Sequence, residues 1–364
     1  MSGDVEESEK ASAPKQQVKK ATKRPSKAKN PKPAKVKKSN LNKPMTTEEL
    51  IKLKEAEQMY HTSLLHMQIE ELLQEVKLKE KRRKTIDDFL KIISNRIEKI
   101  PESPERDLVD QTWLPKKVKV PFLQIPYQVK GKFHFCPPTS IKVVGSYLLG
   151  TCIKPEINVD LAVTMPQEVL QEKDNLNQRY LRKRALYLAH MARHLSRTKI
   201  FGSVKFAYMN SNHLKPVLLL RPQGKDETLV TVRVHVCLPP GFFKSSRFFP
   251  SKNNVRTAWY MEENNNQDES ASGPPTPHYN NAVLCDLALE QHFHHLSSCI
   301  TDFPGMRDGI FILKVWLRQR QLDKGYGCFN GFLASMLVAY LLSKNKVTRM
   351  MNGHQVLRNT LQFL

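Results

Sequence analysis

The fold of this protein is decided by the stretch from Val143 to Val163, which reads VVGSYLLGTCIKPEINVDLAV. The pattern predicts a strand that ends at Gly145 and Ser146, eleven intervening residues, and a second strand that carries Asn158 and Asp160. A Gly-Ser turn lets backbone N–H groups and a hydroxyl approach a triphosphate, because glycine has no Cβ in the way. Residues i and i+2 on a strand point to one face, so two carboxylates at that spacing can hold Mg²⁺ together.

The same stretch lacks most of the acidic residues that such a metal site needs. Asn158 stands two residues before Asp160, where a metal pair would need a second carboxylate, and a carboxamide coordinates weakly without neutralising the ion. A later strand candidate, Val230 to Val236, alternates four valines with Thr231, Arg233 and His235. If this strand should supply a third carboxylate, it offers a guanidinium and an imidazole instead. The formal charge facing the metals then falls from −3 to about zero.

We therefore predict a degenerate pocket with no catalytic residue, no bound metal and no cofactor. Its residues are Gly145, Ser146, Asn158, Asp160, Arg233 and His235. One alternative stays open, because Asp226 or Glu227 would reach the site if the register of the later strand were shifted.

Composition and charge limit the class of protein. The 364 residues correspond to about two domains, and a hydrophobic content of 40% argues against a wholly disordered chain. The 58 Lys and Arg exceed the 35 Asp and Glu by 23, which makes nucleic acid the expected partner. The six cysteines stand far apart without a C-x-x-C pair, which argues against a zinc ribbon or a disulfide framework and favours a reducing compartment.

Neither end of the chain predicts a membrane segment. The N-terminus is acidic and has no apolar stretch, so it is no secretory signal. The longest apolar run, Phe332 to Leu342, is too short for a bilayer span and predicts a buried helix. The last residues form an apolar pattern that stops at Leu364, from which we expect a shortened product with an incomplete helical domain.

Basic residues are concentrated in two segments. Between Lys10 and Thr47 there are thirteen Lys or Arg and no acid, so this tail is expected to be disordered. A second basic segment, Asp174 to Leu195, has helical periodicity. As candidate RNA contacts we name Lys19, Lys20, Lys23, Arg24, Arg179, Arg182, Lys183 and Arg184. The alternative for the tail is a merely solubilising role.

The remaining pattern predicts an α/β or α+β domain followed by helices. Two amphipathic helices are expected first, opened by capping boxes at Thr46 and Thr85, and they either cover the following domain or dock a partner. Further strands are expected at Val204 to Met209 and Leu229 to Leu238. The predicted divisions are the tail, 1–47; the amphipathic helices, 48–112; the degenerate domain, 113–261; a flexible insertion, 262–281; and the helical domain, 282–364.

Taken together, these motifs resemble a known superfamily and, within it, one family. The Gly-Ser turn and the Asn158–Asp160 strand resemble a DNA polymerase beta-like nucleotidyltransferase domain. The run from Ile312 to Leu342 resembles the all-helical domain that follows it in poly(A) polymerases and oligoadenylate synthetases. Two further segments, Asn177 to Leu188 and Pro274 to Asn280, narrow the resemblance to the nucleolar RNA-associated protein (Nrap) family, from about Leu50 to the end.

The resemblance implies a subunit of the small-subunit processome that acts in nucleolar pre-rRNA processing. It implies pre-ribosomal RNA, small nucleolar ribonucleoprotein components and other processome subunits as partners, and association with mitotic chromosomes. It implies no membrane and no small-molecule substrate. Family chains hold several such modules in series, of which this sequence would hold the first.

Three functions remain open from the sequence. The first is a non-enzymatic RNA-associated scaffold with a pseudo-nucleotidyltransferase domain. The second is an active template-independent RNA nucleotidyltransferase, and the third is a pure protein-docking platform whose tail acts only in targeting. Weaker signals favour structural roles: His292, His294 and His295 with Cys285 and Cys299 lack a second ligand pair for zinc. Trp316 and Phe329 at helical spacing are more typical of core than of base stacking.

Overall fold

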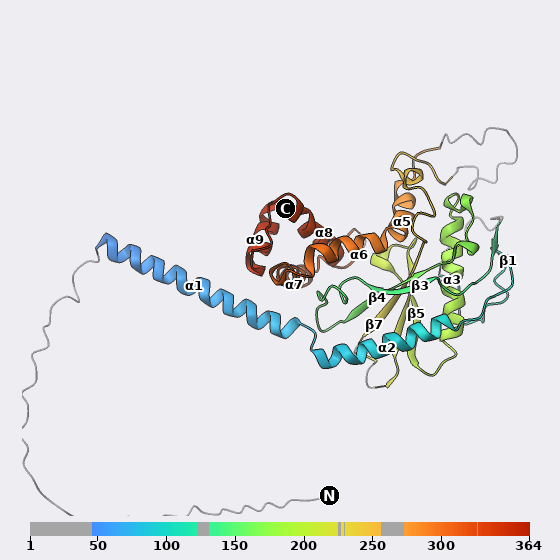
Figure 1. The fold of residues 1–364 in the computed structure, drawn as a ribbon, viewed down its shortest axis with the longest axis horizontal. Helices are drawn as coiled ribbons and strands as arrows, with labels where there is room; N and C mark the ends of the chain where they lie inside the picture. The colour runs from blue at the N-terminus through green and yellow to red at the C-terminus, as the bar shows by residue number, and fades with distance from the viewer. Residues whose placement is uncertain (1–45, 122–130, 225–226, 229, 256–272, 326) are drawn as a thin grey trace, which may run out of the picture. The chain divides into compact units, whose positions relative to one another are not determined.

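A computed structural model describes residues 46–121, 131–224, 227–228, 230–255, 273–325 and 327–364. The chain divides into two compact units, Met1–Gln58 and Met59–Leu364. Most of the first unit, including the predicted RNA contacts Lys19, Lys20, Lys23 and Arg24 and the expected disorder of the tail, lies outside the described residues. The second unit contains the sheet and the helices that are described below (Figure 1).

A five-stranded mixed sheet forms the centre of the second unit, in the order β3-β4-β7-β6-β5 (Figure 1). Its strands are β3 (Ser140–Val144), β4 (Asn158–Thr164), β5 (Phe201–Tyr208), β6 (Pro216–Pro222) and β7 (Thr231–Cys237). Only the central pair β4 and β7 is parallel; the other neighbours are antiparallel. A separate ladder joins β1 (Arg106–Asp107) to β2 (Lys132–Phe133). β4 and β7 lie side by side, so the side chains that the sequence singled out on each of them can meet.

Helices α2 (Glu80–Glu98) and α3 (Arg179–Leu195) complete the core around this sheet. Five apolar residues of α2 are buried in the same core as the valines of β7: Ile86, Phe89, Leu90, Ile93 and Ile97. Burial of this stripe confirms that α2 covers the domain that follows it. Its predicted start is wrong, however, because the helix begins at Glu80 and Thr85 lies inside it, where its hydroxyl donates to the Lys81 carbonyl.

Helix α1 (Thr47–Val76) begins as predicted, with a reciprocal capping box in which the Glu49 N–H donates to Thr46 Oγ1 and the Thr46 N–H to Glu49 Oε2. Most of its apolar side chains are exposed, and only Leu73 is buried. Near the end of the helix, Leu73 packs with Ile153, Phe311 and Ile312. Of the two roles left open for these helices, burial supports covering of the following domain for α2, and most apolar side chains of α1 stay exposed.

The chain after the sheet is helical, as predicted. It forms α5 (Pro277–Leu287), α6 (Leu289–Ile300), α7 (Pro304–Gln319), α8 (Gly331–Ser343) and α9 (Gly353–Phe363) (Figure 1). Residues of α6, α7, α8 and α9 share a second hydrophobic core, which also includes Leu149 from the loop after β3. This succession of a mixed sheet domain and a helical domain confirms the predicted fold class.

Three sequence predictions about the elements need correction. Strand β6 was missed, because prolines at both ends disguise the apolar run Val217 to Leu220. The helix predicted from Asp174 begins only at Arg179, since Asn177 and Gln178 adopt left-handed conformations before it. The expected insertion 262–281 does not extend to its predicted end.

Part of that insertion is outside the described residues, and its last residues belong to α5. The side chain of Asn280 is buried there and connects α5 to the preceding loop, because its amide accepts from Asn254 Nδ2 at 2.7 Å and donates to the Lys252 carbonyl at 2.8 Å. The segment around Asn280 is therefore a packed structural element.

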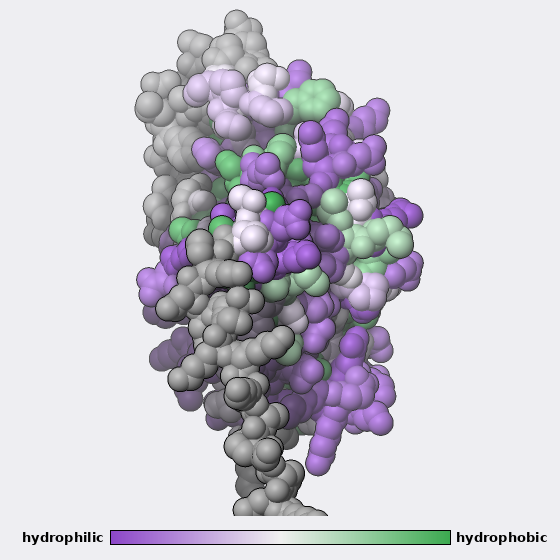
Figure 2. Space-filling model, turned by 90° about the vertical axis from the view of Figure 1, so that its left-hand side faces the viewer, coloured by the Kyte–Doolittle hydropathy of each residue, from purple (hydrophilic) through white to green (hydrophobic). Residues whose placement is uncertain are grey.

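The hydropathy of the surface and of the helices bears on the apolar run that the sequence singled out. Figure 2 shows a face on which hydrophilic side chains predominate and hydrophobic ones are scattered among them. Within the described ranges, no helix is long and apolar enough to cross a membrane. The apolar run Phe332 to Leu342 forms α8, of which Val338 and Leu341 are buried and Phe332 and Tyr340 are exposed.

Candidate functional site

The parallel pairing of β4 and β7 brings Asp160 directly opposite Arg233. Arg233 approaches the Asp160 carboxylate with Nε at 2.7 Å from Oδ1 and Nη2 at 2.9 Å from Oδ2. The Nε2 atom of His235 lies 2.9 Å from the same Oδ1. We call these three residues the Asp160 cluster. The valines at 232, 234 and 236 are buried on the opposite face, so the alternation and register predicted for this strand are confirmed.

That register answers the alternative left open by the sequence for Glu227. Glu227 lies exposed in the turn before β7, and Thr231, not an acid, pairs with Asn158. Asp226 lies outside the described residues. Where a third carboxylate was looked for on β7, the strand presents Arg233.

The charges of the Asp160 cluster compensate one another. Burial alone would raise the pKa of Asp160, but the Arg233 guanidinium and the hydrogen-bonded His235 outweigh it and hold that pKa well below the usual range. Asp160 is therefore ionised at neutral pH. Both of its oxygens are already engaged by cationic or hydrogen-bonding side chains.

Gly145 allows the turn after β3 to approach this carboxylate. Its φ is +74°, and a Cβ at this position would lie 2.8 Å from Asp160 Oδ2. The turn is closed by hydrogen bonds from the Leu149 N–H to the Gly145 carbonyl and from the Thr151 N–H to the Ser146 carbonyl. The Gly-Ser turn predicted from the sequence is thus present, and here it packs against a carboxylate.

The residues of this site do not fit the Mg²⁺ ions that a nucleotidyltransferase-like arrangement implies. Hard divalent cations need anionic oxygen ligands. Asp160 has its oxygens engaged, Asn158 offers an uncharged amide, and Arg233 adds a positive charge. In the part of the chain that the structure describes, no group of three or more His, Cys, Asp or Glu could hold a metal ion. We derive no step through a metal at this site.

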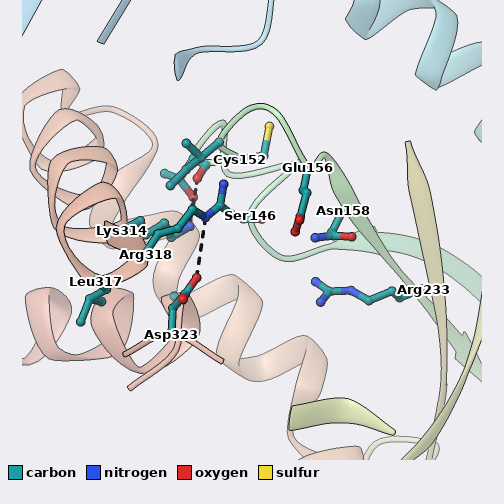
Figure 3. A pocket seen from close by; sticks show the side chains of 12 residues that line it. Ser146, Cys152, Glu156, Asn158, Arg233, Lys314, Leu317, Arg318 and Asp323 are labelled. Carbon is teal, nitrogen blue, oxygen red and sulfur yellow. Dashed lines mark hydrogen bonds and ion pairs between the residues drawn. The ribbon is translucent and has the colours of Figure 1, made fainter. Parts of the chain in front are cut away.

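A pocket of about 140 Å³ lies beside the Asp160 cluster (Figure 3). Asn158 and Arg233 line it from the sheet, Ser146 and Glu156 from the connecting loop, and Lys314 from α7. Its complete lining is Ser146, Thr151, Cys152, Ile153, Glu156, Asn158, Arg233, Lys314, Leu317, Arg318, Asp323 and Gly331. The structure thus brings together all six predicted pocket residues, three of them lining this cavity and the other three, Gly145, Asp160 and His235, adjoining it.

Lys314 is one of the charged lining residues that the sequence analysis missed, together with Glu156, Arg318 and Asp323. It is a single charged residue in the otherwise apolar run from Gly309 to Leu317. Arg318 follows it by four residues, which places both cations on one side of the helix. A charged residue within an apolar run was the sequence signal that could have pointed to Lys314. The sequence could not show which part of the sheet domain α7 contacts.

The predicted RNA contacts on α3 are corrected by the structure. Arg182, Lys183 and Arg184 are almost fully buried, so they cannot reach a phosphate backbone from the folded surface. Lys183 pairs with Asp174 at 2.8 Å, and Arg184 pairs with Asp286 at 2.9 Å. Lys183 and Arg184 therefore neutralise acidic side chains inside the domain.

Arg179, at the start of α3, is half-buried. It is the one predicted α3 contact that keeps part of its side chain at the surface of the described body.

The weaker sequence signals have structural explanations. The His292 ring lies 5.5 Å from that of Phe332. Cys285 lies on α5, whereas the three histidines and Cys299 lie on α6, and no metal-binding group is formed among the described residues. Trp316 and Phe329 pack against the second hydrophobic core, which confirms their interpretation as core residues. All six cysteines are free thiols.

Comparison with known proteins identifies the family. The model of Nrap protein domain 1 matches residues 103–302, and that of the Nrap protein PAP/OAS-like domain matches residues 305–364. The chain belongs to the Nrap family. The second match also agrees with the helical domain that follows the sheet.

Relatives of the chain carry the name Nucleolar protein 6. The protein from Xenopus tropicalis is 72% identical over 332 residues, which cover 91% of this chain and 29% of the relative. The human protein is 57% identical over the same number of residues, with 91% and 29% covered. The chain thus spans less than a third of the length of these relatives.

Two solved structures align with much of the chain at low sequence identity. The GLD-2/RNP-8 complex aligns with a TM-score of 0.43 and 12% identity, covering 82% of this chain and 82% of that one. A structure of the RNA terminal uridylyl transferase Cid1 aligns with a TM-score of 0.39 and 13% identity, covering 75% and 51%.

Proposed function

We propose that this protein is a non-catalytic, RNA-associated scaffold that acts in the nucleolus as part of the small-subunit processome. Its relatives are named as nucleolar proteins, and the family resemblance implies pre-rRNA processing and assembly of the small ribosomal subunit. Its partners would be pre-ribosomal RNA, small nucleolar ribonucleoprotein components and other processome subunits.

The observation that carries the non-catalytic part is the composition of the Asp160 cluster. Transfer of a nucleotide by two metal ions requires several free carboxylates at one place. Here the carboxylate on β4 is bound by Arg233 and His235 from the neighbouring strand. In this proposal the sheet domain retains its fold, and Arg233 and His235 stabilise it where metal ions would otherwise bind.

RNA association rests on the charge that the fold leaves exposed. On α2, Lys81, Arg82 and Lys84 are exposed, in contrast to the buried cations of α3. The basic tail adds Lys19, Lys20, Lys23 and Arg24. Contacts of this type are salt-sensitive and tolerate different sequences, because they are made to phosphates.

Crosslinking of the protein to RNA in cells, followed by sequencing, tests the RNA association. The full chain is compared with a chain that lacks residues 1–47, and a chain with the tail lysines 19, 20 and 23 changed to glutamine serves as a milder control. We expect pre-ribosomal RNA with both full and shortened chains. If only the tailed chain crosslinks, or if other RNAs dominate, the body is a protein-docking platform and the proposal fails.

The alternative of an active template-independent RNA nucleotidyltransferase is tested separately. The purified chain is incubated with an oligoribonucleotide, each ribonucleoside triphosphate, and Mg²⁺ or Mn²⁺. We expect no extension, and no difference between the chain and its Asp160→Asn variant. Extension that depends on Asp160 would replace the scaffold proposal by the enzymatic one.

A further inference from the structure

A surface with one exposed aromatic ring lies on the segment that leads from β7 to α5 (Figure 1). The Phe249 side chain is 55% exposed, although the neighbouring Phe248 is buried in the core of the sheet domain. The same segment carries three exposed cations, Lys244, Arg247 and Lys252. We call Phe249 and these three cations the Phe249 surface. Neither the degenerate pocket nor the RNA contacts proposed above include any of the four residues.

The backbone of the Phe249 surface is held by two buried asparagines. Asn280 Nδ2 donates to the carbonyls of Phe249 at 3.0 Å and of Lys252 at 2.8 Å. Asn254 Nδ2 donates to the Arg247 carbonyl at 2.9 Å. The side chains of both asparagines are almost fully buried, and a satisfied buried polar network makes the segment that it holds rigid. The exposed side chains are therefore presented from a fixed backbone, which reduces the entropy lost when a ligand binds.

The cations of the Phe249 surface lack acidic partners. Among the described residues, no carboxylate oxygen lies within 4.0 Å of Lys244, Arg247 or Lys252. The Arg247 guanidinium donates to a backbone carbonyl, that of Glu172, at 3.1 Å. This arrangement contrasts with the buried cations of α3, which are paired with acids inside the domain. Three positive charges without counter-charges beside one ring favour an anionic ligand.

The small size of the apolar part favours a nucleic acid over a protein. A stable protein–protein interface has a hydrophobic core and buries about 800 Å² on each side. One exposed ring among cations is small for such a core. The same combination is typical of sites for single-stranded nucleic acid, in which a base stacks on the ring and cations contact the phosphates. Bases in a duplex are already stacked on one another, so the ring is accessible to an unpaired base.

We propose that the Phe249 surface binds single-stranded RNA, with one unpaired base stacked on the Phe249 ring and the flanking phosphates contacted by its three cations. The proposal rests on the proposed function, because it assigns a site on the folded body to the RNA association stated there. Binding of this kind tolerates different base sequences, since every base has a flat face.

The test measures the affinity of the purified 364-residue chain for a fluorescent oligouridylate, by anisotropy at fixed ionic strength. In all proteins compared, the thirteen Lys and Arg between Lys10 and Thr47 are changed to glutamine, so that the tail does not mask the body. We expect Phe249→Leu to weaken binding about tenfold, since leucine keeps an apolar side chain but cannot stack on a base. Phe249→Trp should bind at least as tightly as the parent chain. The matched control Phe363→Leu changes a phenylalanine of similar exposure, 50%, on α9 and should alter the affinity less than twofold.

The salt dependence of binding separates the ring from the cations. Each phosphate contact to a single strand contributes about 0.7 to the slope of log affinity against log salt concentration. Changing Lys244, Arg247 and Lys252 together to glutamine should therefore reduce the magnitude of this slope by about 2. Phe249→Leu should leave the slope unchanged. An RNA duplex of the same length should bind Phe249→Leu and the parent chain equally.

The outcomes separate this inference from the proposed function. Unchanged oligouridylate affinity in Phe249→Leu overturns the inference and leaves RNA association through other parts of the chain intact. An equal loss in Phe249→Leu and Phe363→Leu also overturns it, because the loss is then not specific to this surface. If a photoreactive residue at position 249 crosslinks in cells to protein and not to RNA, the surface docks a protein and the inference is wrong. Absence of RNA binding by the parent chain overturns both the inference and RNA association of the folded body.

Discussion

The Asp160 cluster should behave as a structural ion pair, and a double-mutant cycle measures this. Removing one partner of a buried ion pair costs about 3–5 kcal/mol, because the other charge stays buried without a counter-charge. The side chains of Arg233 and Asp160 are 24% and 15% exposed, so the lower end of that range applies. We expect Arg233→Met and Asp160→Asn each to lower the free energy of unfolding by about 3 kcal/mol. Their coupling energy should be about 2 kcal/mol.

The assay is urea denaturation of the two single variants, the double variant and the wild type. Arg221→Met is a matched control on the adjacent strand β6, where the exposed Arg221 donates to Thr231 Oγ1; its cost should stay within about 0.5 kcal/mol. A coupling energy near zero would refute the structural role of the pair. So would a rise in the melting temperature of the wild type on addition of Mg²⁺, because the carboxylate would then be available to the metal.

The pH dependence of this coupling follows from the lowered pKa of Asp160. A carboxyl whose pKa is lower in the folded than in the unfolded chain contributes its full stability above the unfolded value of about 4. The contribution is lost as the pH falls further towards the folded pKa. The coupling should therefore be smaller at pH 3.5 than at pH 5.

Three further predictions concern other parts of the body. Asp286→Asn should lower the free energy of unfolding in urea by about 3 kcal/mol, because it leaves the buried Arg184 guanidinium without its carboxylate. Burial lowers the pKa of His190 to about 4, so the free energy of unfolding of the wild type should fall by about 2 kcal/mol as the pH falls from 6.5 to 4. Thermal melts of His190→Phe over the same pH range should not show this loss of stability. Gly145→Ala should destabilise by about 1–3 kcal/mol in the same denaturation assay, since it places a Cβ in a left-handed conformation against Asp160; an unchanged midpoint would contradict the close approach.

Two-residue periodicity made the site predictable on the strands. The alternation of valines with Thr231, Arg233 and His235 determines which side chains share a face. Once β7 is paired in parallel with β4, the register alone determines that Arg233 lies opposite Asp160. A one-residue shift would have moved the valines out of the core, so the hydrophobic pattern itself selects the register.

The errors arose where the partner of a side chain lies far away in the sequence. In the sequence, Lys183 and Arg184 resemble a solvent-facing basic stripe. Their partners are Asp174, which precedes α3 in the chain, and Asp286, which follows it. Charge composition shows how many cations a segment has and cannot show whether acids meet them in the fold. Lys314 was missed for the same reason, because its contact with Thr151 joins residues 163 positions apart.

The same pairing decides where the positive charge of the protein is available to RNA. The first 47 residues carry thirteen basic side chains against Asp4, Glu6, Glu7 and Glu9, so a chain without them retains +14 of the +23. The buried cations of α3 contribute to that total, yet those paired with internal acids add no net field at the surface. The charge left over must therefore reside on exposed groups such as Lys81, Arg82 and Lys84. Because +14 is still a large net charge, RNA contact by the body itself is electrostatically reasonable, and it does not depend on the buried stripe that the sequence first indicated.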